Sequence, residues 1–199
     1  RDLTKISQQE SEALWSHHNA QRSRTAQVAS QWQEAVDTDP KLLKYMVRGK
    51  FWEILDDLSI TLIVSREYEH LVIALSVKNA TPSITFMPMP HPSGIAVDRI
   101  KSTVYVASTR NPNQIYDLLP ADSMTARLDI HLTESFDKPL LPVRSRFLPG
   151  SLYLHDLALI GNQLYANAVG HNAVDLLGAD GGYKPVWWPI CIETEEGPA

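Results

Sequence analysis

The chain has 199 residues, of which 44% are hydrophobic and 21% charged, and its formal net charge is −5. This composition suits one globular domain and excludes collagen, coiled coil and intrinsic disorder. Residues 1–50 carry 8 Lys/Arg against 6 Asp/Glu, whereas residues 51–199 carry 10 against 17. Because acidic residues prevail over most of the chain, nucleic acid is not expected as a partner.

The sequence gives no sign of a membrane span or a leader. No apolar run approaches the roughly 18 residues needed to cross a bilayer, and residues 1–9 lack the apolar core of a signal peptide. The single cysteine, Cys191, excludes an intrachain disulfide and a cysteine cluster for zinc. We therefore expect a soluble protein and favour the cytoplasm, while export stays open for a chain already processed at its start.

Residues 1–50 are predicted to form a helical arm. They contain no glycine before Gly49 and no proline before Pro40. The composition predicts a long helix over residues 7–36, in which apolar positions are sparse. A second helix is predicted to start at Pro40, with Asp39 as its N-cap, and to run through Met46.

Residues 51–199 are predicted to be β-rich. After one more helical turn at residues 51–55, two runs dominated by β-branched residues, 60–64 and 71–75, flank the charged stretch 66–70. This arrangement predicts a hairpin. From there Pro and Gly recur every few residues and helical periodicity is lost, which is typical of an all-β domain.

Two segments of the β-rich part are similar to each other. Residues 91–98 and 104–108 form the first, and residues 155–160 and 163–167 form the second. Each begins with a histidine, followed by small or polar residues and by an alanine between two apolar residues. A turn and a tyrosine between two apolar residues come next, and this pattern predicts two paired strands. Their repetition indicates the blades of a β-propeller. The two histidines are 64 residues apart, more than a blade of roughly 40 to 50 residues, and a loop inserted around residues 119–142 accounts for the excess.

Four stretches carry a resemblance to a known family. They are FWEILDDLSITLIVSREYEHLVIALS (51–76), MPMPHPSGIAVDRIKSTVYVAS (87–108), SLYLHDLALIGNQLYANAVGHNAVDLL (151–177) and PVWWP (185–189). Over about residues 51–199 the chain resembles the N-terminal half of an uncharacterised bacterial family of conserved hypothetical proteins with β-propeller-like repeats. The resemblance implies a propeller fold but no established reaction. It places a family His at His155 and a family Asn at Asn167, whereas the place of His91 is often an arginine in that family.

The predicted fold class is therefore mainly β, an incomplete β-propeller preceded by the helical arm. About two to three blades fit into residues 51–199, while a closed propeller has roughly four to eight. The resembled family continues with further blades. We expect the ring to be completed by another polypeptide, either the downstream half of the same precursor or a second copy of this chain.

Histidines are the main candidates for chemistry. In a propeller the first residues of each innermost strand face the central channel, so His91 and His155 are candidate metal ligands, and His171, which follows the partner strand, is a third. Imidazole ligands suit a divalent ion such as zinc, copper or iron. The alternative is that each histidine caps its strand by hydrogen bonding. Asp98 and Asp175 follow apolar runs and are predicted to be turn residues.

Two further residues are candidates for ligand binding. Asn167 stands where the resembled family keeps an Asn. Arg110, with Arg144 and Arg146, falls in predicted loops and is a candidate for binding an anionic ligand, the alternative being ordinary surface charge.

Two classes of function follow. In the first, the histidines hold a metal ion that polarises water or a substrate oxygen, and the protein is a lyase or hydrolase acting on a small molecule or peptide. In the second, the propeller is a non-catalytic binding or assembly module. The fold alone does not decide between them, because propellers serve both uses.

Overall fold

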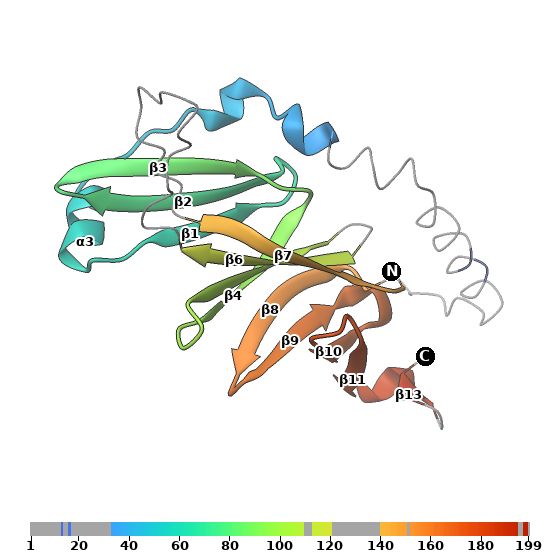
Figure 1. Ribbon diagram of the computed structural model, residues 1–199. Coiled ribbons are helices and arrows are strands. Elements are labelled where there is room, and N and C mark those ends of the chain that lie inside the picture. Colours follow the sequence, from blue (N-terminus) through green and yellow to red (C-terminus); the bar gives the residue numbers. More distant parts are fainter. Residues whose placement is uncertain are drawn as a thin grey trace, which may run out of the picture.

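The computed structural model of the protein describes residues 13, 16, 33–109, 113–120, 140–150, 152–194 and 197–198 (Figure 1). It is mainly β, as predicted, with three antiparallel sheets of three or four strands and one short two-stranded sheet. Residues 33–36 are helical where the long helix was predicted to end, and most of residues 7–32 lie outside the described part. No helix in the described part is long and apolar enough to cross a membrane.

The second predicted helix is shorter than expected. It is a 3-10 helix, η1 (Pro40–Leu43), and its N-cap is Asp39, whose side chain accepts the N–H of Lys41 at 2.9 Å. The prediction that it runs through Met46 was wrong. Lys44 already has an extended backbone, with φ −77° and ψ 137°, so the intrahelical hydrogen bonds stop there.

The first of the large sheets, sheet A, follows the helix α3 (Phe51–Asp57), whose Leu55 is buried. Its strands are β1 (Leu62–Arg66), β2 (Leu71–Lys78) and β3 (Thr81–Pro88), in that order. The antiparallel pairing of β1 with β2 confirms the predicted hairpin. Asn79 and Ala80 join β2 to β3 with φ of 48° and 58°, the left-handed values that a tight two-residue hairpin turn requires.

Two four-stranded sheets follow, and in both of them neighbours in the chain are neighbours in space. Sheet B consists of β4 (Pro92–Asp98), β5 (Thr103–Ser108), β6 (Asn113–Pro120) and β7 (Leu140–Leu148). Sheet C consists of β8 (Leu154–Ile160), β9 (Gln163–Ala168), β10 (Ala173–Leu177) and β11 (Tyr183–Trp187). The short elements are η2 (Val169–His171), η3 (Ile190–Ile192), β12 (Glu193–Thr194) and β13 (Gly197–Pro198).

Sheet B lies between sheets A and C, and both of its faces are covered (Figure 1). Side chains alternate between the two faces of a strand. Val104 and Val106 of β5 pack with Val72 of sheet A, whereas Tyr105 and Ala107 belong to the core shared with sheet C. This two-sided burial explains why β5 is a nearly continuous apolar run.

The first strands of the three sheets are joined across the stack. The Ser65 hydroxyl of β1 donates to the Ser93 carbonyl of β4 at 2.6 Å, and the Ser93 hydroxyl donates to the His155 carbonyl of β8 at 2.8 Å. Gly94 allows this approach, since a Cβ there would lie 2.5 Å from the backbone of Asp156. The position therefore has no room for any side chain.

The two similar segments each form a pair of antiparallel strands, but their histidines are not equivalent. Ala96 of β4 pairs with Tyr105, and Ala158 of β8 pairs with Tyr165. His91 is five residues before its alanine, whereas His155 is only three before the corresponding one. The residue that matches His91 in sheet C is Tyr153, because each has a positive φ and a carbonyl that accepts an N–H from just beyond the partner strand.

Candidate functional site

The structure does not gather the three histidines predicted as ligands. His155 is exposed on β8, and His171 is half-buried at the end of η2. Within the described ranges, neither belongs to a group of three or more side chains able to share a metal ion. Asn167 is exposed on β9, where it pairs with Asp156 and the neighbouring strand, and Arg110 lies outside the described residues.

His91, the remaining predicted ligand, lies beside a second histidine. His91 directly precedes β4, is 8% exposed, and contacts His70, which directly precedes β2. The two rings meet edge to face, with 4.2 Å between their centroids and 69° between their planes. The His91 N–H donates to Nδ1 of His70 at 3.2 Å.

Backbone hydrogen bonds hold both histidines in place. The His70 N–H closes the turn onto the Glu67 carbonyl at 3.2 Å, and the His70 carbonyl accepts the Met89 N–H at 2.9 Å. The His91 carbonyl accepts the Thr109 N–H at 3.1 Å. Both residues have left-handed backbones, with φ of 56° and 40°, which is uncommon outside glycine. The strand ends thus fix the backbone from which each imidazole projects.

Glu34 completes the group from outside the sheets. It lies in the helical turn at residues 33–36, where Ala35 is 1% exposed and anchors the segment. The Thr38 hydroxyl donates to the Ala35 carbonyl at 2.8 Å and also lies 3.4 Å from the Glu69 carbonyl, next to His70. Oε2 of Glu34 is 3.9 Å from Nε2 of His70.

The three side chains form a compact set of metal-ligating atoms. One ligand atom from each of Glu34, His70 and His91 lies within 4.8 Å of the others. Two imidazoles and one carboxylate are a donor set used by catalytic zinc sites, which keep a fourth position open for water or substrate. The two histidines are largely buried and Glu34 is exposed, so the set is open on the side of the carboxylate.

His171, beside sheet C, is already paired with an aspartate. Nε2 of His171 lies 2.9 Å from Oδ2 of Asp175, which is completely buried. The prediction that Asp175 is a turn residue was wrong, because it lies in the middle of β10. Burial, aided by the charge of Asp175, raises the pKa of Tyr183, whose ring is 5.9 Å from that of His171. Asp98 does fit its prediction, since its carboxylate accepts the turn N–H groups of Ile100 and Lys101.

Sequence reasoning missed His70 and Glu34. His70 was assigned only to the hairpin connection, and nothing in the spacing of residues 34, 70 and 91 indicates a shared site. One signal was present: His70 and His91 each stand directly before an apolar strand. Their proximity depends on the pairing of β2 with β3, whose last residue, Pro88, lies opposite Leu71.

Comparison with known proteins gives a family but no activity. The profile described as "Domain of unknown function (DUF4915)" matches residues 49–197. No curated protein matches the chain.

Proposed function

Because the chain belongs to the DUF4915 family, whose function is unknown, we propose from the geometry of the site that Glu34, His70 and His91 bind a divalent metal ion. The observation that carries this proposal is the approach of their three ligand atoms to within 4.8 Å of one another. Such an ion supplies water activation at neutral pH, so the proposed chemistry is that of a hydrolase or lyase acting on a small molecule or peptide.

Only small movements would bring the three ligands to bonding distance. Metal–nitrogen bonds of about 2.05 Å in a tetrahedral site separate neighbouring ligand atoms by about 3.3 Å, and Glu34 Oε2 is already 3.9 Å from His70 Nε2. The exposed Glu34 side chain has the freedom to close this gap, whereas the histidine backbones are held by the strands.

Metal binding has one identifiable cost. While Nδ1 of His70 accepts the His91 N–H, the neutral ring carries its proton on Nε2. Binding through Nε2 moves the proton to Nδ1, and the hydrogen bond is lost. Loss of a hydrogen bond to a largely buried donor costs about 1 to 3 kcal/mol, and the metal–ligand bonds must exceed this cost.

The proposal is tested by zinc titration of the full chain after treatment with a chelator. We expect one equivalent of zinc to bind by calorimetry, and at least about tenfold weaker binding in H91N and E34Q. Asn is chosen because it tolerates a left-handed backbone. H155N is the matched control, since His155 lies outside the group. Absence of zinc binding, or equal binding by H91N and the native chain, would refute the site.

We propose in addition that sheets B and C are blades of a β-propeller. Their sequential strand order and face-to-face packing support this, as does the direct contact of β4 with β8. The described residues form three such sheets, fewer than a closed ring needs, and we propose that a second polypeptide or a second copy supplies further blades. Exposed apolar side chains at Trp187 and Ile190 favour such an assembly. Native mass spectrometry tests it, and a stable 22.3 kDa monomer would exclude it.

A further inference from the structure

A second candidate site lies at the opposite end of β4 from His91. A cavity of about 330 Å³ opens between the turns of sheets B and C, and three cationic side chains line it, Lys101 from the β4–β5 turn and Arg144 and Arg146 from β7. Asn162 of the β8–β9 turn and Gln163 at the start of β9 also line it. The rest of the lining consists of four leucines of sheet C together with Tyr105, Gly178 and Ala179.

Arg146 is the most constrained of the three cations. It is 9% exposed, its NH2 group lies 3.0 Å from Oδ1 of Asp117, and its NH1 group donates to the Gly178 carbonyl at 3.3 Å. The guanidinium carbon lies 5.6 Å from the centre of the Tyr105 ring. Within the described residues, its Nε–H is buried and has no hydrogen-bond partner. A buried donor without an acceptor is costly and marks a place where an acceptor is missing.

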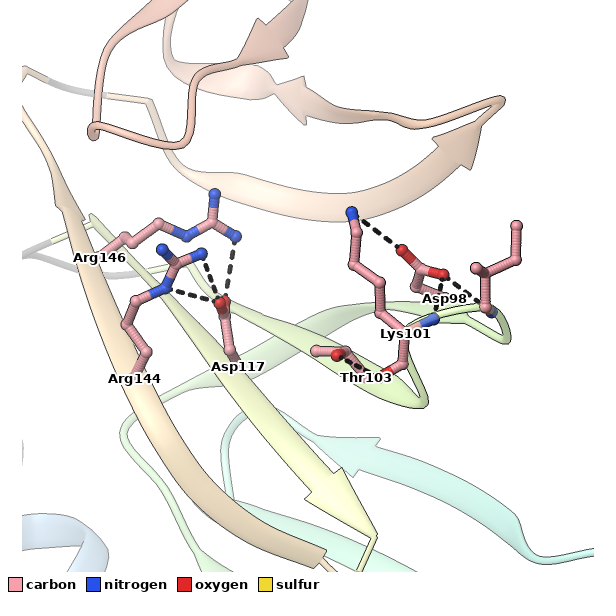
Figure 2. A network of polar contacts seen from close by, with 7 residues as sticks. Asp98, Lys101, Thr103, Asp117, Arg144 and Arg146 are labelled. Carbon is pink, nitrogen blue, oxygen red and sulfur yellow. Dashed lines mark hydrogen bonds and ion pairs between the residues drawn. The ribbon is translucent and has the colours of Figure 1, made fainter.

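Two arginines share one carboxylate beside the cavity. Figure 2 shows Arg144 and Arg146 converging on the single carboxylate of Asp117, with Arg144 contacting Oδ2 through both Nε at 2.8 Å and NH2 at 2.7 Å. On the other side Lys101 approaches Asp98 at 3.3 Å. Within the described residues, these three cations thus contact two carboxylates, and a third carboxylate, that of Asp180, lies beside Gly178, which lines the cavity.

We propose that this cavity binds a small organic carboxylate. Its carboxylate group would accept hydrogen bonds from the arginines, since guanidinium groups bind carboxylates with two parallel hydrogen bonds. Its apolar body would lie against Leu159, Leu164 and Leu176, which line the same cavity. The volume fits a compact ligand. This site is independent of the metal proposal, because it shares no residue with Glu34, His70 or His91.

The test uses the full chain and benzoate, with acetate and inorganic phosphate as probes that lack an apolar body. We expect saturable 1:1 binding of benzoate by calorimetry, with acetate and phosphate binding at least about tenfold more weakly because they bury no apolar surface. R144Q should weaken benzoate binding at least about tenfold through loss of a charge-assisted contact. K184Q is the matched control, since Lys184 is exposed on β11 and does not line the cavity.

Two results would overturn the proposal. One is the absence of saturable benzoate binding to the folded native chain, and the other is equal binding by R144Q and K184Q. H70N should keep its affinity for benzoate, so failure at this cavity is distinguishable from failure at the metal site. Arg144 is half-exposed, so R144Q is expected to fold, and its circular dichroism spectrum checks this.

Discussion

Replacement of Gly94 by alanine tests the packing of β4 against β8. The added Cβ would lie 2.5 Å from Cα and the carbonyl carbon of Asp156 and from the Leu157 nitrogen. All three are backbone atoms, so no side-chain rotation relieves the contact, and the two strands must separate. The Ser93 hydroxyl would then lose its hydrogen bond to the His155 carbonyl.

The expected destabilisation follows from these contacts. Overpacking costs about 1 to 3 kcal/mol, and the lost hydrogen bond adds about 1 kcal/mol. The reduced entropy of the unfolded alanine chain offsets about 0.4 to 1 kcal/mol. We therefore expect the free energy of unfolding of G94A to fall by about 1 to 3.6 kcal/mol, and Tm to fall by about 2 to 14 °C.

Urea unfolding followed by tryptophan fluorescence measures this change. G182A is the matched control, because the nearest atom to a Cβ at Gly182 is Oδ1 of Asp180 at 3.3 Å, which is the end of an exposed side chain and can rotate slightly while it accepts the Gly182 N–H. Its stability should stay within about 0.5 kcal/mol of the native value. A G94A protein as stable as G182A would refute the inference that sheets B and C meet backbone to backbone at this position.

Two other substitutions address the buried charges. D117N removes the carboxylate that Arg144 and Arg146 share, and we expect its free energy of unfolding, measured in urea, to fall by about 3 kcal/mol. D57N is the control, because Asp57 is exposed, and its stability should not change. If D117N and D57N are equally stable, the two ion pairs of Asp117 do not stabilise the fold. D175N should lower the pKa of Tyr183 but leave it above the ordinary value of 10.0, because burial is the larger cause and is retained. Because the pKa of Tyr183 is raised in the folded state, the contribution of Tyr183 to the free energy of unfolding is fully present below pH 10. It is lost as the pH rises through the folded-state pKa, and D175N should lose less stability over this pH range than the native chain. Phenolate absorbance during a pH titration measures the shift, and an unchanged pKa would exclude the effect of the Asp175 charge.

Much of the fold was predictable because local signals agreed with the tertiary structure. The β-branched runs around the charged turn at 66–70 predicted the β1–β2 hairpin, and the two similar segments predicted the pairing of β4 with β5 and of β8 with β9. The helix from Pro40 was overextended, since its capping signal fixes a start but nothing in residues 44–46 signals the end.

The site was less predictable because it depends on contacts between segments far apart in the chain. Matching His91 with His155 ignored the two-residue difference in their distance to the following alanine, and in a strand that difference moves a residue along the sheet. Glu34 and Asp175 could not be assigned from spacing. Glu34 belongs to a segment outside the sheets. The role of Asp175 depends on its hydrogen bond to His171, which only the folded structure shows.

Of the three proposed metal ligands, Glu34 lies outside the part of the chain that matches the family. The family match begins at residue 49, so His70 and His91 lie inside the shared domain, whereas Glu34 precedes it. A metal ion bound by all three would cross-link the domain to this preceding segment, and binding would stabilise the docked arrangement by mass action. Without Glu34, the two histidines would supply only two ligands and would bind the ion more weakly. The affinity for the metal ion would then depend on a segment that lies outside the family domain. A change of sequence around Glu34 would change this affinity and leave the three sheets as they are.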